Sequence, residues 1–224
     1  MNNRNVPIVP ALSGTLAIVL PFAGQALSGG NGSPDLSASR AKIESWLASQ
    51  NLSASHFAGG VLELIGILTL IVFAATLWSV LRRADSDDGI ASATAFGAGL
   101  TAAAVKLASF PAAFAAVWRH KQGISPQLAA ALIDMNNVSF VLMWTLFAVM
   151  LAASAAVIFR SAVLPRWLGW FGAVTAAILI VSAPAADVVP PLGMLLAFLW
   201  ILATSVVLTR RALGPRTRAV SATA

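Results

Sequence analysis

The chain has 224 residues, of which 58% are hydrophobic and only 10% are charged, and its net charge at pH 7 is +6. A soluble domain carries charged residues at about a quarter of its positions, so this composition excludes a soluble globular protein. The chain has no cysteine, which excludes disulfides, thiolate metal sites and cysteine nucleophiles. With only two histidines as well, we expect a membrane protein without a metal or cofactor.

Six apolar segments are long enough for membrane-spanning helices, which need about 20 residues, with a range of about 17–25. They predict an all-α bundle of six transmembrane helices in one membrane domain, 1–211, followed by a basic cytoplasmic tail, 212–224. The predicted spans are residues 8–27, 57–81, 90–118, 138–159, 167–183 and 192–208.

The first apolar segment also has features of a secretory signal. Arg4 precedes the apolar run, and Gly24 and Ala26 place small residues near its end, as at a cleavage site. We favour a retained span, because Pro21 is tolerated in a spanning helix when neighbouring groups satisfy its backbone. Cleavage would leave five spans with the same sidedness.

The long polar stretch 28–55 separates the first two spans as an outer loop. Ser33, Pro34 and Asp35 have the residue types of a helix start, namely a serine cap, a proline at the first position and an acid in the first turn. The pattern that follows predicts a short amphipathic helix on the membrane surface or capping the bundle, with an ordinary packed loop helix as the alternative. Its apolar side comprises Leu36, Ile43, Trp46, Leu47 and Gln50.

A second helix start of the same kind is Ser125 followed by Pro126. It predicts a short helix over 127–133 that leads into a polar run, 134–137, before the fourth span. In the third span, Pro111 predicts a kink near the outer surface.

Basic residues set the predicted orientation, because they favour the cytoplasmic side of a membrane protein. With the N-terminus inside, the inner segments hold nine Lys and Arg residues and the outer segments hold four, with Lys106 inside a span. We therefore expect both termini in the cytoplasm. The chain has no tyrosine to stack on bases and no basic face to follow a phosphate backbone, so we expect no nucleic-acid partner.

Several short segments carry a family resemblance. They are 164–170, at the start of the fifth span, 124–129 and 132–136 upstream of it, and 199–204, which precedes Arg210 and Arg211. Together with the long first outer loop, they resemble a bacterial integral-membrane family catalogued as domain of unknown function 4386. The resemblance covers most of the chain from the second span onward. It implies six spans and a location in the bacterial inner membrane, and it brings no activity and no catalytic residues.

Two charges lie inside predicted spans, Glu63 in the second and Lys106 in the third. Charges in a spanning helix are expensive and suggest a functional site. Each lies about five residues outward of its span's centre, which is roughly 7–8 Å at the rise of an α-helix. Consecutive antiparallel helices usually touch, so we expect the two charges at matched depth on neighbouring helices. Three interpretations stay open: an ion pair that fixes helix packing, Lys106 extending to the outer surface, and a polar pocket open to the outside.

Other polar residues are predicted on the same side of the membrane. His56 lies seven residues before Glu63 and therefore on nearly the same helix face. Gly59, Gly60 and Gly66 flank Glu63 and are predicted to be helix-packing residues. The full candidate pocket comprises Glu63, Lys106, His56, Arg119, His120, Asp134 and Asn137.

No phosphate-binding loop, zinc-binding helix or nucleophile elbow is present in the sequence, so we predict no catalytic residue. We expect a non-enzymatic membrane protein whose pocket binds a lipid, a small amphiphile or a partner protein. Its small-residue helix faces would permit a homo-oligomer or another protein partner. The alternative is a small proton-coupled transporter or membrane-embedded enzyme, with Glu63 as the titrating group and His56 or His120 as a relay. The two halves show no internal repeat, which weakens the transporter interpretation.

Overall fold

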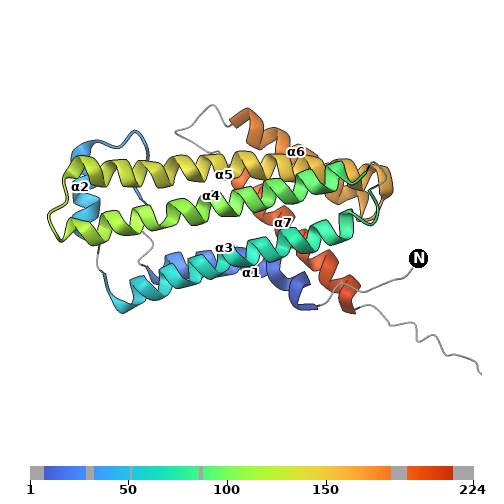
Figure 1. The fold of residues 1–224 in the computed structure, drawn as a ribbon, viewed down its shortest axis with the longest axis horizontal. Coiled ribbons are helices and arrows are strands. Elements are labelled where there is room, and N and C mark those ends of the chain that lie inside the picture. The colour runs from blue at the N-terminus through green and yellow to red at the C-terminus, as the bar shows by residue number, and fades with distance from the viewer. Residues whose placement is uncertain (1–7, 29–32, 51, 86–87, 183–190, 214–224) are drawn as a thin grey trace, which may run out of the picture.

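The computed structural model describes residues 8–28, 33–50, 52–85, 88–182 and 191–213. Over these residues the chain forms seven α-helices and no strand (Figure 1). The helices are α1 (Ile8–Leu27), α2 (Arg40–Ser49), α3 (Ala54–Leu81), α4 (Ile90–His120), α5 (Pro126–Ser161), α6 (Arg166–Ser182) and α7 (Pro191–Leu213).

Five of the described helices, α1, α3, α4, α5 and α7, are long and apolar enough to cross a membrane. The remaining long element, α6, is apolar but has only 17 residues. The chain is therefore an all-α, multi-pass membrane protein, as its composition predicts. The predicted turn between the last two spans and the basic tail lie largely outside the described residues.

Helix α5 is longer than the sequence pattern predicts. The expected short helix 127–133 and the expected span 138–159 form one helix of 36 residues. Ser125 caps it as predicted, accepting a hydrogen bond from the backbone N–H of Leu128 at 3.3 Å. The polar run 134–137 does not break the helix, because the side chains of Asn136 and Asn137 bond to groups outside α5 rather than to its own backbone.

The start predicted at Ser33 for the outer-loop helix is wrong. Helix α2 begins at Arg40 and is capped by Ser39, whose hydroxyl accepts a hydrogen bond from the backbone N–H of Lys42 at 3.3 Å. The hydroxyl of Ser33 instead donates to Oδ1 of Asn137 in α5 at 3.0 Å. The loop before α2 is thus docked on the bundle and does not continue the helix.

Glycines allow α1 and α3 to pack closely. Gly24 and Gly59 face each other at the crossing, and a Cβ added to either would collide with the backbone oxygen of the other. Gly66 faces the ring of Pro21 in the same way. Gly59 and Gly66 are therefore packing residues, as predicted for glycines that let helix backbones approach in lipid.

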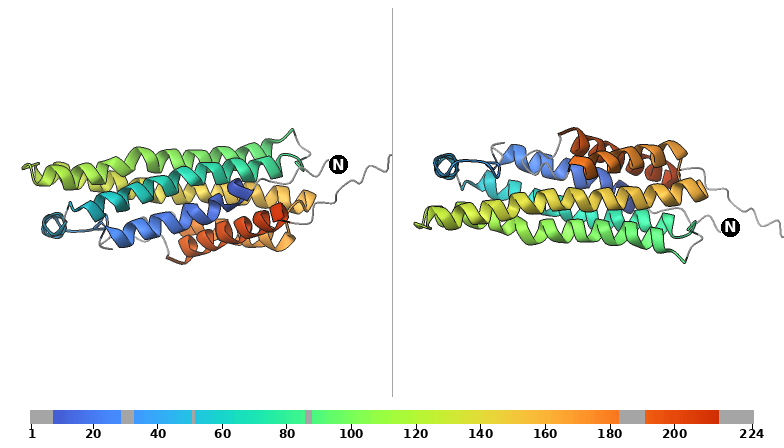
Figure 2. Two further views of the ribbon diagram at one scale, coloured as in Figure 1. Left: turned by 90° about the horizontal axis from the view of Figure 1, so that it is seen from below. Right: turned by 90° about the horizontal axis from the view of Figure 1, so that it is seen from above.

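Hydrogen bonds join α7 to α1 and to α6. The Ser205 hydroxyl in α7 donates to the carbonyl of Ala11 in α1 at 2.6 Å and accepts from the backbone N–H of Thr15 at 3.3 Å. Trp200 Nε1, also in α7, donates to the carbonyl of Leu168 in α6 at 2.9 Å. The first and last apolar helices are therefore packed side by side (Figures 1 and 2).

Helices α4 and α5 lie side by side along the length of the molecule, and at one end α2 lies across them (Figure 2). A second hydrophobic cluster forms there, separate from the main core. It contains Ile43 and Leu47 of α2, Ala116 and Val117 of α4, and Ala129 and Ile133 of α5. The outer-loop helix therefore caps the end of the bundle with its apolar side buried.

Candidate functional site

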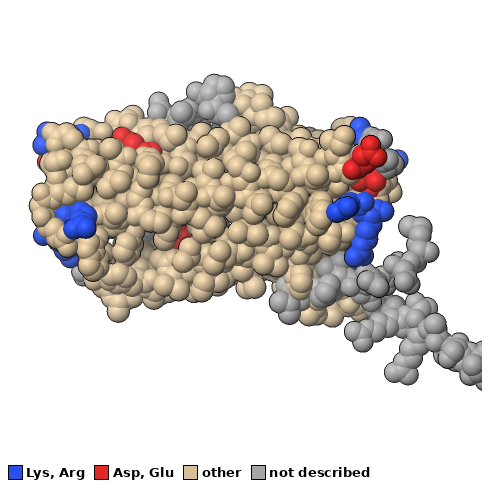
Figure 3. Space-filling view, in the orientation of Figure 1, with Lys and Arg blue, Asp and Glu red and all other residues tan. Residues whose placement is uncertain are grey.

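Charged side chains gather at the two ends of the bundle, and the surface between them is almost free of charge (Figure 3). Lys106 is a charged residue of this middle section, but it is buried and only 8% exposed. Glu63 is half-buried. These two residues define the site.

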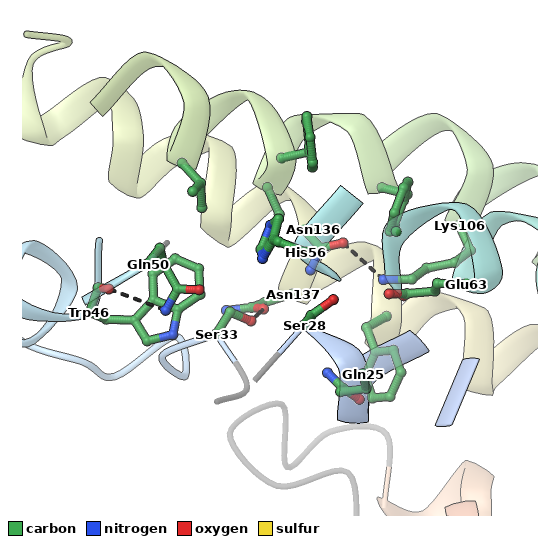
Figure 4. A pocket seen from close by; sticks show the side chains of 16 residues that line it. Gln25, Ser28, Ser33, Trp46, Gln50, His56, Glu63, Lys106, Asn136 and Asn137 are labelled. Atoms are coloured by element: carbon green, nitrogen blue, oxygen red, sulfur yellow. Dashed lines mark hydrogen bonds between the residues drawn. The ribbon is translucent and has the colours of Figure 1, made fainter. Parts of the chain in front are cut away.

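A cavity of about 410 Å³ lies near the end of the bundle that α2 caps (Figure 4). Helix α3 contributes His56, Gly60 and Glu63, which share one face because they are four and three residues apart. The face of the molecule seen in Figure 3 is hollowed near this end, between the positions of α3 and α4. The apolar part of the wall is formed by Trp46, Phe110, Ala113, Phe114, Val117 and Phe140.

Lys106 is held by groups on α5. Its ammonium donates to Oδ1 of Asn136 at 2.9 Å and lies 5.5 Å from the ring centroid of Phe140. These contacts offset part of the cost of burying the charge. Lys106 therefore turns toward the cavity, and the interpretation in which it extends to the outer surface is wrong.

Glu63 lies beside Lys106 in the cavity, and the two charges interact electrostatically (Figure 4). No salt bridge joins the two side chains, so the interpretation as an ion pair that fixes helix packing is not supported. Salt bridges join Arg40 to Glu44 and Lys42 to Asp35, both at exposed positions in and before α2. The two buried charges thus share one cavity without closing it.

His56 and Asn137 line the same cavity. Nδ1 of His56 is buried and has no hydrogen-bond partner in the part of the chain that the structure describes. Asn137 accepts from Ser33 and donates through Nδ2 to the carbonyl of Pro34 at 2.7 Å. Asn137 therefore builds the wall, whereas His56 presents an unsatisfied polar atom.

Three residues of the predicted pocket do not line the cavity: Arg119, His120 and Asp134. Arg119 donates to Oε1 of Gln122 at 2.7 Å at the exposed end of α4, and His120 ends that helix, beyond the last lining residue. Asp134 is two residues from Asn136, and two residues turn an α-helix by about 200°. These positions share an end of the bundle with the cavity but not its surface.

Several lining residues were absent from the predicted pocket. Asn136 was left out of the predicted pocket, although it lies in the same polar run as Asp134 and Asn137. Gln25 and Trp46 come from α1 and α2, and Ser28 and Gln50 directly follow these two helices. Their part in the cavity depends on how distant elements pack, which no local pattern encodes.

The cavity brings together several kinds of polar group. It offers one carboxylate, one ammonium, side-chain amides and hydroxyls, and a ring nitrogen. Among the described residues no group of three metal-ligating side chains comes together.

Outside the membrane-spanning helices, a hydrogen bond from the Ser37 hydroxyl, aided by the nearby charge of Lys42, holds the pKa of Asp35 below its usual value.

The long apolar helices, with charged residues buried among them, define a multi-pass helical membrane protein. Residues 46–217 match the family described as domain of unknown function DUF4386, and the chain belongs to this family. The match extends from α2 to beyond the end of α7, which confirms the resemblance seen in the sequence. No curated protein and no solved structure matches the chain.

Proposed function

We propose that the chain crosses the bacterial inner membrane six times, with both termini in the cytoplasm and the cavity open toward the outer side. The start of α1 and the end of α7 lie at the same end of the bundle, as an even number of spans requires (Figure 1). Arg82 and Arg83 lie at that end too, and Arg210 and Arg211 are in the last turn of α7. This basic end fits the cytoplasmic side.

We further propose that the cavity binds the polar part of a lipid or of another small amphiphile, without catalysis. The observation that carries this proposal is a cavity of about 410 Å³ that reaches Glu63 and Lys106, whose charges do not pair with each other. A purely structural pair would satisfy itself and be sealed by apolar neighbours. Volumes of about 300–1,000 Å³ with a few polar groups in a mainly apolar wall are typical of small-molecule sites.

One observation favours a second candidate function, a proton-coupled transporter or membrane-embedded enzyme. Glu63 lines the cavity, and His56, whose buried Nδ1 has no hydrogen-bond partner in the described residues, lies on the same helix face. Such a carboxyl group has the surroundings of a titrating group. In this case, protons would move on ligand addition, whereas simple binding would leave the bulk pH of a lightly buffered vesicle suspension unchanged.

Native mass spectrometry of the intact protein, released from mild detergent, tests the binding proposal. We expect a bound small molecule in the wild-type protein and its loss in the Glu63→Gln, Lys106→Met double variant. Lys42→Met is the matched control, because it removes an exposed lysine away from the cavity that holds Lys106. An identical set of bound molecules in all three proteins would contradict the proposed function.

A further inference from the structure

We propose that the cavity recognises a zwitterionic headgroup, in which a short linker joins a primary ammonium to a phosphate diester, as in the ethanolamine headgroup. The ammonium would bind Glu63 and the phosphate would bind Lys106. This inference rests on the binding function proposed above and specifies the chemistry of the ligand.

The charge balance of the cavity favours a ligand with no net charge. Among the sixteen lining residues, Glu63 and Lys106 are the only Asp, Glu, Lys or Arg, and their charges sum to zero. A net anion would leave Glu63 uncompensated, and a net cation would do the same to Lys106. An uncompensated charge is costly in a medium of low polarity. A zwitterion satisfies both groups at once.

Lys106 and Glu63 have hydrogen-bonding groups that no described residue uses, and these indicate which charged groups the ligand carries. An ammonium has three N–H donors, and Lys106 directs one of them to Asn136. Its remaining donors need an anionic acceptor, and a lysine is a common phosphate-binding residue. No hydrogen bond from a described side chain occupies the carboxylate of Glu63, so its oxygens can accept N–H donors from a ligand. A primary ammonium supplies these, whereas a quaternary ammonium has none.

The cavity wall favours a headgroup that enters from the side of the bundle. Near the cavity, rings make the contacts between α3 and α4: Phe57 lies 5.3 Å from Phe114 and 5.9 Å from Trp118 between ring centroids. In the half of the bundle away from the cavity, α3 and α4 approach each other closely, because a Cβ on Gly99 of α4 would lie 3.2 Å from Cβ of Ala74 in α3. The surface is hollowed between these helices near the cavity (Figure 3). A lipid's glycerol part would leave through this opening.

The same headgroup chemistry occurs in a membrane lipid and in a water-soluble molecule, and the test separates the two. The purified full-length protein, in a maltoside detergent, is titrated with glycerophosphoethanolamine and with dihexanoyl phosphatidylethanolamine. Glycerophosphocholine lacks the N–H groups, glycerol 3-phosphate lacks the cation, and ethanolamine lacks the anion. Binding is measured by calorimetry and by the shift in thermal unfolding.

We expect both ethanolamine compounds to bind at least tenfold more tightly than the three comparison molecules. At least tenfold tighter binding of the dihexanoyl lipid than of glycerophosphoethanolamine would identify a lipid ligand, and equal binding would identify the soluble headgroup. Glu63→Gln should abolish the preference for ethanolamine over choline, and Lys42→Met should preserve it. The titrations of the wild-type protein with the five compounds test the inference even if a cavity variant fails to fold.

Two results would overturn the inference. Glycerophosphocholine binding as tightly as glycerophosphoethanolamine would rule out recognition of the ammonium N–H groups. Binding by glycerol 3-phosphate alone at equal affinity would rule out a zwitterion. If no headgroup compound binds while native mass spectrometry still detects another molecule that depends on Glu63 and Lys106, this inference fails and the proposed function stands. If no headgroup compound binds and native mass spectrometry detects no bound molecule that depends on Glu63 and Lys106, both this inference and the proposed function fail.

Discussion

Lys106 carries a charge in a part of α4 that is otherwise apolar, and several features of its surroundings offset the cost. Oδ1 of Asn136 accepts a hydrogen bond from it, the ring of Phe140 lies near its ammonium, and Glu63 supplies an opposite charge in the same cavity. Two of these groups come from α5 and one from α3. A single buried ammonium thus connects three helices.

The Lys106–Asn136 hydrogen bond is testable by a double-mutant cycle. We expect Asn136→Leu to destabilise the protein by about 1.5–3 kcal/mol, because it leaves a buried ammonium without its acceptor. Adding Lys106→Met should recover part of that loss, since the ammonium is then absent. Thermal unfolding in detergent of the wild type, both single variants and the double variant measures the coupling. Strictly additive effects would show that the bond does not contribute.

The interaction between Glu63 and Lys106 predicts that removing one charge is more harmful to stability than exchanging the two. Glu63→Gln should lower the midpoint of thermal unfolding in detergent, because it removes the opposite charge that faces a buried ammonium. The exchanged pair, Glu63→Lys with Lys106→Glu, should regain part of the loss. An unchanged midpoint for Glu63→Gln would mean that the two charges do not stabilise each other.

Helices α1 and α3 cross closely near the site, which predicts a large difference between two glycine substitutions. Gly59→Ala should lower the unfolding midpoint by several degrees, because the new methyl group collides with the backbone oxygen of Gly24. Gly97→Ala is the matched control, because its methyl group would have no neighbour within 4 Å. Alanine favours a helix over glycine by about 1 kcal/mol, so this control should be neutral or stabilising. Equal loss in both variants would contradict the close crossing.

Helices were more predictable from the sequence than their connections were. Long apolar runs indicate spanning helices directly, and the bounds predicted for the first span agree with those of α1. The continuity of α5 was hidden, because the partner of Asn136 is 30 residues away and that of Asn137 is 103 residues away. The start of α2 was misplaced, because Ser33 has the residue type of a cap but bonds to α5 instead.

The site was predictable only in part for a related reason. Glu63 and Lys106 are conspicuous because a charge within an apolar run is rare, and His56 follows from its spacing to Glu63. Arg119, His120 and Asp134 were grouped with them by depth alone, and depth does not determine which side of a helix a residue occupies. The contributions of Gln25 and Trp46 follow from tertiary packing and have no local signal.

At the scale of the whole molecule, helix lengths determine where the cavity lies relative to the membrane. With 36 residues, α5 is about 54 Å long, and α4 with 31 residues is about 46 Å long. The hydrocarbon core of a bilayer is about 30 Å thick, so both helices extend beyond it. The end that carries α2 fits this projection, because it has charged side chains and a separate small core. We infer that the cavity extends from the lipid-embedded part of the bundle, at Glu63 and Lys106, toward the boundary with water.

The proposed orientation can be tested with single thiols, since the chain has no cysteine of its own. Ser37 precedes α2, and Ala84 follows α3 at the opposite end of the bundle. In intact cells, a membrane-impermeant maleimide should label Ser37→Cys and should label Ala84→Cys only after permeabilisation. The reverse pattern would mean that the termini face outward.

Chemical labelling from outside the cell shows whether the cavity faces outward. Ala113 lines the cavity, whereas its neighbour Ala112 on the same helix is buried. In intact cells, we predict that a small impermeant thiol reagent modifies Ala113→Cys and leaves Ala112→Cys unmodified. An unreactive Ala113→Cys that becomes reactive only after permeabilisation, or equal reactivity at the two positions, would contradict an outward-facing cavity at Glu63 and Lys106.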